Sequence, residues 1–499
     1  MELIASGAGA GIALQALLGL ALTFTRAARY PVAFVSGMAT VAAAIYLWRK
    51  GIFRELQRDL SRPIRAALAI WMLFAISCVA VTHLIVALPA ALPDGRYIFK
   101  QNTLNVRLQY LTTLPADNFL PYAVTEFFLR RISFRAEHPL LPGQEVGNRT
   151  ILMSLVALPY RATLAMPPRA KHPLPRFSYV QSEWPDVSAI YREDYYRQML
   201  VVGIFLNSLL LLGLIAVFSA AGRNRWILPW AATLYLTNPF LLTQTIFIWP
   251  KALAGFFLLL AWQALRRRSH PALVGAWAAL ACHSHPLAGI FSLGLGAFYL
   301  VRVWRGRATI REAVLFGVSL SLLLAPWFLW TKFYLQLPSD LLWQNVAGAG
   351  TELALSSALN FVWVRFWNFF QLLAPMMFFV YPFDAAAIVE AVQNCLPGAV
   401  GIFLIVPAWL ETARTLRPKS FLWCAVAGPL LGIVVLFSFP ALPLLHGFQV
   451  AVGGLIFFGV IALARRGSPV FFWTVCSLQL ASNLCLLGLR AHVTGLHFP

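Results

Sequence analysis

Two charged residues in this sequence stand where each could act on a substrate at a membrane surface. The first is Asp117, just ahead of an expected amphipathic helix in which Asn118 suits the N-cap and Pro121 the first turn. A carboxylate there could accept a proton from a hydroxyl as a general base. It could equally stabilise the positive end of the helix by roughly 0.3–1 kcal/mol. Glu126 and Arg130, four residues apart, are expected to form an ordinary surface ion pair.

The second charged residue is Lys251, which follows Trp249 and Pro250 at the expected outer start of a membrane span. A cation in the first turn of a helix opposes the helix dipole, whereas a phosphate there is attracted by both the dipole and the ammonium group. Lys251 is therefore a candidate phosphate-binding residue. The alternative is a lysine whose stem lies in the span while its ammonium group reaches the interface.

Two arginines and a histidine complete the candidate binding residues. Arg149 follows a glycine turn near an expected helix start, where it could clamp a phosphate or form a local ion pair. Arg365 lies among aromatic residues in a segment expected on the membrane surface. His285 ends the run 282–285, whose spacing suits a polar turn or a substrate contact better than a metal site. No metal ligands are predicted.

Composition places these residues in a membrane protein. Hydrophobic residues make up 60% of the 499 residues and charged residues only 11%, which excludes a soluble domain of this length. The net charge of +21 comes from short Lys and Arg clusters at the ends of apolar runs. These clusters indicate membrane lipid headgroups as partners, and no nucleic acid.

Apolar runs of suitable length predict an all-α polytopic membrane protein with about thirteen transmembrane helices. Placing the basic loop 49–65 on the cytoplasmic side puts five further basic clusters there too, if each run crosses once: 223–225, 266–268, 302–311, 414–419 and 465–466. The apolar segment 353–383 is predicted to lie along or dip into the outer face rather than cross. The approximate limits of the spans are 7–24, 31–48, 66–91, 198–220, 227–248, 251–265, 271–285, 287–302, 313–330, 396–410, 420–441, 447–464 and 470–490.

The spans divide the chain into five parts. Three N-terminal spans (1–92) precede a large extracytoplasmic loop (93–197), followed by spans 4 to 9 (198–330), a second outer loop with an amphipathic segment (331–395), and spans 10 to 13 (396–499). The two outer loops hold thirteen of the 18 acidic residues, so chemistry is expected on the outer face. No span carries Asp or Glu near its centre, which argues against an ion-coupled transporter.

Three segments resemble the GT-C superfamily of integral-membrane glycosyltransferases. Residues 117–122 are similar to the acidic segment of its first outer loop, 148–150 to an Asp-Arg-Pro-type segment of bacterial members, and 238–286 to its middle spans. The resemblance covers about residues 66–330. The chain departs from the family in having Asn148 where an acid is usual, and in placing three spans before the large loop rather than one.

The resemblance implies a hexosyl- or pentosyltransferase of the bacterial inner membrane. It would move a sugar from a polyprenyl-phosphate donor to a hydroxyl of a glycan, lipid or protein acceptor at the outer face. Asp117 would be the base, while Lys251, Arg149, Arg365 and His285 would bind the lipid phosphate. A divalent metal ion could share that task, although no cofactor ligands are visible.

Three alternatives stay open: a lipid-linked glycan polymerase or ligase, a lipid flippase or carrier, and a non-enzymatic assembly factor. A flippase or carrier requires a hydrophilic cavity. The polar residues available within the spans are too few to line one: His83, Asn207, Asn238 and Gln244.

Overall fold

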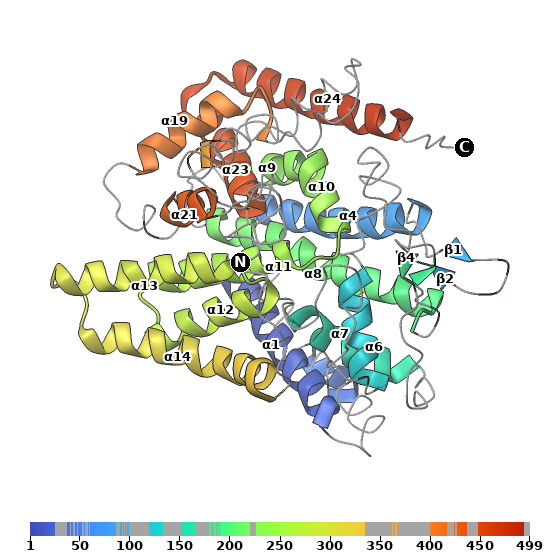
Figure 1. Cartoon of the computed structure of the whole chain (residues 1–499). Helices are drawn as coiled ribbons and strands as arrows, with labels where there is room; N and C mark the ends of the chain where they lie inside the picture. Colours follow the sequence, from blue (N-terminus) through green and yellow to red (C-terminus); the bar gives the residue numbers. More distant parts are fainter. Residues whose placement is uncertain are drawn as a thin grey trace.

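The computed structural model describes most of the predicted spans and parts of the loops (Figure 1). Shorter pieces are described between 37 and 58, between 90 and 98, at 132, between 179 and 188, between 362 and 366, and at 424. The continuous stretches are 1–24, 60–85, 119–130, 151–164, 190–219, 226–334, 400–416, 427–436 and 448–493.

The described elements are almost all helices, as the composition predicts. Two pairs of two-residue antiparallel strands, β1 (Ala90–Ala91) with β2 (Tyr97–Ile98) and β3 (Tyr179–Val180) with β4 (Trp184–Pro185), are the exceptions in the described part of the chain. The helices are α1 (Glu2–Phe24), α4 (Arg62–Ile85), α6 (Leu120–Arg130), α7 (Leu152–Leu164), α8 (Glu193–Ser219), α9 (Ile227–Leu236), α10 (Pro239–Ile246), α11 (Lys251–Arg266), α12 (Pro271–Ser284), α13 (Ala288–Trp304), α14 (Ile310–Leu329), the π-helical η3 (Trp330–Tyr334), α19 (Ile405–Leu416), α21 (Gly428–Leu436), α23 (Phe448–Arg466) and α24 (Pro469–Val493).

Among the described residues, six helices are long and apolar enough to cross a membrane, which supports the predicted multi-pass membrane protein. They are Glu2–Thr23, Arg62–Ala80, Glu193–Ser219, Ile310–Tyr334, Gln449–Arg466 and Pro469–Gly488. The sharply bent pair α10 and α11 adds a seventh if it counts as one span. The span predicted over 227–248 consists of two helices, because α9 ends at Leu236 and Asn238 with Pro239 starts α10.

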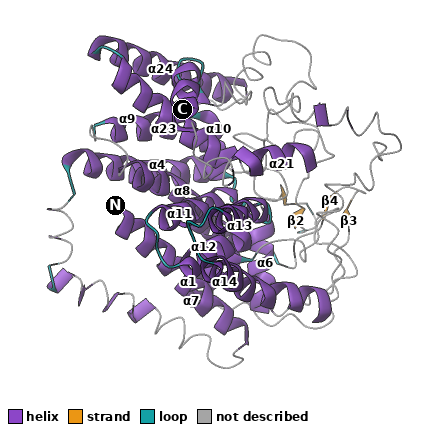
Figure 2. Ribbon diagram, turned by 90° about the vertical axis from the view of Figure 1, so that its left-hand side faces the viewer, coloured by secondary structure: helices purple, strands orange, loops and turns teal. Residues whose placement is uncertain are grey.

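Helix α8 forms the centre of the bundle, next to α11 (Figures 1 and 2). Its apolar window is 78% buried, whereas the window over α14 and η3 is only 6% buried. A helix that is apolar on all sides is stable either inside a protein or against lipid. Side chains such as Leu322 and Phe328 of α14 are exposed, so this helix has the surface expected of one that faces lipid.

The two ends of α1 contact different parts of the chain. At its start, Glu2 forms an ion pair with Arg267, just after α11. Near its end, Leu22 packs with Leu129 of α6 and Leu158 of α7. A 23-residue helix is about 35 Å long, close to the ~30 Å thickness of a bilayer core. The basic cluster around Arg267 and the helices of the large loop therefore lie at opposite ends of a membrane-length helix.

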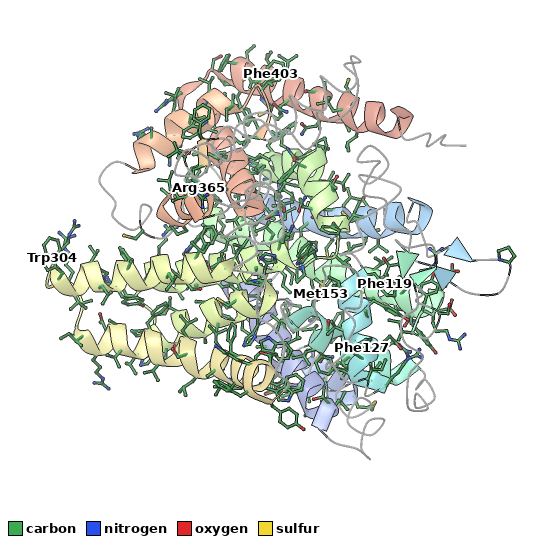
Figure 3. All side chains as sticks on the ribbon, in the orientation of Figure 1. Phe119, Phe127, Met153, Trp304, Arg365 and Phe403 are labelled. Atoms are coloured by element: carbon green, nitrogen blue, oxygen red, sulfur yellow. The ribbon has the colours of Figure 1, made fainter. Side chains whose placement is uncertain are left out.

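Figure 1 also shows a basic turn and the strands of the large loop on opposite sides of the molecule. The basic turn between α13 and α14, which begins at Trp304, lies at the left edge, and both strand pairs lie at the right edge (Figures 1 and 3). A further ion pair, Glu411 with Arg465, joins the end of α19 to the end of α23. Both residues belong to loops predicted to be cytoplasmic.

Helices α1 and α7 approach closely at a proline. Six prolines between 159 and 185 favour irregular structure, but α7 continues through Pro159 to Leu164. Pro159 has no N–H to donate to the carbonyl of Leu155, four residues earlier. Gly19 of α1 lies against that carbonyl, and a Cβ at Gly19 would be only 2.0 Å from the Leu155 oxygen. Contacts with α1, α6 and α8 hold α7 in place despite the proline.

Substituting Gly19 is therefore expected to destabilise the fold. Gly19→Ala should lower the free energy of unfolding by about 1–3 kcal/mol, because the backbone of α7 must shift to make room. Thermal unfolding in lipid nanodiscs measures the loss. Gly7→Ala is the matched control in the same helix, because a Cβ at Gly7 meets nothing within 4 Å. Equal melting temperatures for the two variants would contradict the prediction.

Candidate functional site

The candidate site lies where α10 ends and α11 begins. These two helices are separated by residues 247–250 and bend by 104° relative to each other. Proline at 250 has no N–H and disfavours a helical conformation at Trp249, so the chain cannot continue α10 directly into α11. Carbonyl groups in such a break need hydrogen-bond donors, because lipid supplies none.

Asn207 of α8 supplies these donors. Its Nδ2 donates to the carbonyl oxygens of Phe247 at 3.0 Å, Trp249 at 3.3 Å and Thr245 at 3.5 Å. Its Oδ1 accepts from the backbone N–H of Leu253, in the first turn of α11, at 3.4 Å. One fully buried amide thus satisfies groups on both sides of the break. Asn207 therefore hydrogen-bonds to the helix break and does not line the hydrophilic cavity that a carrier would need.

Lys251 is the first residue of α11 and is buried, with 5% exposure. Its Nζ lies 4.2 Å from the ring centroid of Trp249 and 5.7 Å from that of Phe247. Contact with aromatic faces stabilises a cation by roughly 0.5–2 kcal/mol. The burial does not fit the alternative of a lysine that reaches the interface, which requires an exposed ammonium group.

His285 joins the same group of side chains. It directly follows α12, is 5% exposed, and its ring centroid lies 5.8 Å from that of the half-buried Trp249. Its Nδ1 accepts from the backbone N–H of Leu287 at 3.3 Å, which leaves the proton of a neutral imidazole on Nε2. Trp249 therefore contacts both Lys251 and His285, and we call these three residues the Lys251 cluster.

The Lys251 cluster has the chemistry of an anion site. An anion at the start of α11 would lie near the ammonium group of Lys251, the positive end of the helix dipole and the imidazole ring of His285. Two members, Lys251 and His285, were predicted as binding residues, and the structure brings them together through Trp249.

The other predicted site residues are not part of this cluster as described. Asp117 and Arg149 lie outside the described residues. The helices they precede do form: α6 begins at Leu120 with Pro121 in its first turn, as predicted, and α7 begins at Leu152. Arg365 lies against α21, where its Nε donates to the carbonyl of Val435 at 2.9 Å (Figure 3).

The sequence pattern did not predict a buried charge cluster that forms in the large loop. Glu126 is fully buried, and its carboxylate pairs with Nε of Arg130 at 2.8 Å and with Nε of Arg161 at 2.6 Å. The prediction of an ordinary surface pair was therefore wrong. Arg161 lies 35 residues away on α7, so the local spacing gave no signal for it.

Aromatic residues surround this charge cluster. The guanidinium group of Arg161 lies 3.3 Å from the ring centroid of Tyr195. Tyr122 donates to the carbonyl of Ile190 at 2.8 Å and accepts from the N–H of Arg192 at 3.0 Å. Burial and the nearby negative charge of Glu126 raise the pKa of Tyr122, so its hydroxyl stays neutral. These contacts join α6, α7 and the start of α8.

Tyr191, Tyr195 and Tyr196 lie around the start of α8, where tyrosines are typical of a belt at the membrane interface. Tyr191 and Tyr196 instead lie buried against Phe119 and Tyr122, next to α6. The Glu193–Arg197 pair of α8 is exposed, with a distance of 3.0 Å between its Nε and Oε1 atoms. Figure 3 shows Phe119, Phe127 and Met153 on the side of the molecule where these helices meet. Helix α6 is thus part of a packed core.

Comparison with protein-family models, curated proteins and solved structures finds no match for this chain. Within the described ranges, no group of three or more His, Cys, Asp or Glu residues lies together to hold a metal ion.

Proposed function

We propose that this protein is a membrane glycosyltransferase that moves a sugar from a polyprenyl-phosphate donor to an acceptor hydroxyl at the outer membrane face. The observation that carries this proposal is the burial of Lys251 at the first turn of α11, beside Trp249 and His285. A buried cation at the positive end of a helix is stabilised by a bound anion, and a lipid phosphate can reach such a site from the bilayer. The apolar helices around it suit a prenyl chain.

The proposed topology has about thirteen crossings in a bacterial inner membrane. Its short basic turns face the cytoplasm, and its two long loops of mixed charge, which hold thirteen of the 18 acidic residues, face out. Two ion pairs support it, because Glu2 with Arg267 and Glu411 with Arg465 each join positions that the topology places on the cytoplasmic side.

In the proposed reaction, the acceptor oxygen attacks the anomeric carbon of the sugar as the bond from that carbon to the phosphate oxygen breaks. Asp117 takes the hydroxyl proton, and polyprenyl phosphate leaves with both bond electrons. Lys251, with Arg149, stabilises the charge that builds on the phosphate, and a divalent metal ion is an alternative source of that stabilisation. Asp117 precedes α6, whose side chains are mostly buried, so its helix is well anchored.

A lipid flippase or carrier is the second candidate, and the interrupted pair α10 and α11 favours it. Carriers bind anionic groups at the ends of discontinuous helices, as this pair could. A polymerase or ligase of lipid-linked glycans would need a second lipid-linked oligosaccharide site.

Asp117→Asn is expected to lower turnover by about 10²–10⁴-fold, because the proton of the acceptor then has no base. Transfer of radiolabelled sugar from a panel of polyprenyl-phosphate sugars, by protein in lipid nanodiscs, measures this. Glu193→Gln, which removes an exposed carboxylate, is the control and should leave turnover unchanged. Full turnover in Asp117→Asn would place the base elsewhere. Lipid movement in vesicles without turnover by the wild type would favour the carrier.

A further inference from the structure

A side chain from another helix contacts both sides of the break between α10 and α11. Asn207 of α8 contacts the carbonyls of Phe247 and Trp249, the two residues whose rings lie beside the Lys251 ammonium group. The same side chain also accepts from Leu253 in the first turn of α11. Asn207 therefore fixes both the aromatic residues and the start of the helix that carries Lys251.

We propose that Asn207 is a positioning residue that holds Lys251 and Trp249 in place for the phosphate of a lipid. This proposal rests on the proposed function, because it assigns Asn207 a role in the same phosphate site. Asn207 acts through the backbone of residues 247–253, and nothing in its own contacts requires it to touch the phosphate.

The geometry at this position uses both a hydrogen-bond donor and an acceptor. The carbonyls of the break need N–H donors, while the N–H of Leu253 needs an acceptor. Only a side chain with both kinds of group can serve both sides of the break. Leucine has a similar volume to asparagine but neither group, so Asn207→Leu removes all of these hydrogen bonds without changing the charge near Lys251.

A second break in the same region supplies a matched control. Between α9 and α10, Asn483 of α24 donates to the carbonyl of Leu234 at 3.3 Å and to Oγ1 of Thr237 at 3.2 Å. Asn483 is also buried, at 3% exposure. Its break carries no member of the Lys251 cluster. Asn483→Leu therefore matches the general damage of removing a buried amide at a helix break, while leaving the phosphate site alone.

The experiment measures binding of sugar-free polyprenyl phosphate to the full-length protein in lipid nanodiscs. Asn207→Leu is expected to weaken binding about tenfold or more. A hydrogen bond from the Lys251 ammonium group to the phosphate contributes about 10–100-fold to the affinity, and most of that contribution is lost when Lys251 is misplaced. Asn483→Leu is expected to bind like the wild type at a similar loss of melting temperature. Asn207→Ser, which keeps one hydroxyl donor, is expected to bind with intermediate affinity and replaces the leucine variant if that variant does not fold.

A second readout does not depend on the ligand. Hydrogen exchange of the backbone amides over 247–254 should speed up in Asn207→Leu but not in Asn483→Leu. Unchanged exchange in Asn207→Leu would overturn the proposal. So would equal losses of affinity in both leucine variants, because Asn207 would then have only a general structural role.

The failure of this inference differs from the failure of the proposed function. If the wild type binds polyprenyl phosphate, Lys251→Gln weakens binding and Asn207→Leu does not, then only the role of Asn207 is overturned. If the wild type does not bind the lipid, then the phosphate site is overturned and the role of Asn207 falls with it.

Discussion

Lys251→Gln is expected to weaken binding of polyprenyl phosphate about 10–100-fold, because a charged hydrogen bond to the phosphate is lost. Sugar transfer should fall further, by about 100-fold in kcat, since the lysine also stabilises the negative charge that builds as the phosphate leaves. Glutamine keeps most of the side-chain length and removes the buried positive charge at the N-terminal, positive end of α11.

The measurements are the lipid affinity, kcat and KM of purified protein in nanodiscs. Lys332→Gln is the matched control, because Lys332 is exposed in η3, and its loss should change neither affinity nor rate. If Lys251→Gln binds polyprenyl phosphate as tightly as the wild type, Lys251 does not bind the phosphate, and the observation that carries the proposed function has another cause.

Glu126→Gln is expected to destabilise the protein by about 3–5 kcal/mol. The substitution keeps the shape of the side chain but leaves the guanidinium groups of Arg130 and Arg161 without their buried counter-charge. These arginines are only 10% and 5% exposed, so water cannot replace the carboxylate. Thermal and denaturant unfolding in detergent measure the loss.

Glu193→Gln is the control for this prediction as well. It removes the exposed pair with Arg197, an interaction worth about 0–1 kcal/mol. Replacing Glu126, Arg130 and Arg161 together by apolar residues should restore much of the stability, because no charge is then left buried. A Glu126→Gln protein as stable as the Glu193→Gln protein would show that the buried charge cluster is not needed to join α6 and α7.

The sequence by itself determined those features that depend on local composition and local pattern. Long apolar runs required a polytopic membrane protein, since a helix of this length satisfies the backbone groups of each run within the run itself. Pro121 in the first turn of α6 and the start of α11 at Lys251 followed from residues next to one another in the chain. The start of α10 carried a local signal too, because Asn238 caps the helix and Pro239 begins it.

Only the tertiary structure decided which distant groups meet. Asn207 reaches the helix break from 38 to 46 residues away, and nothing in the residues around it distinguishes this asparagine from one that lines a cavity. Likewise, Glu126 reads locally as half of a helical surface pair until α7 brings Arg161 to its other oxygen. Hydrogen bonds and ion pairs of this kind depend on how helices pack, and a local sequence pattern does not specify that packing. The chemical role of a polar residue inside a membrane protein is therefore set by its neighbours in space.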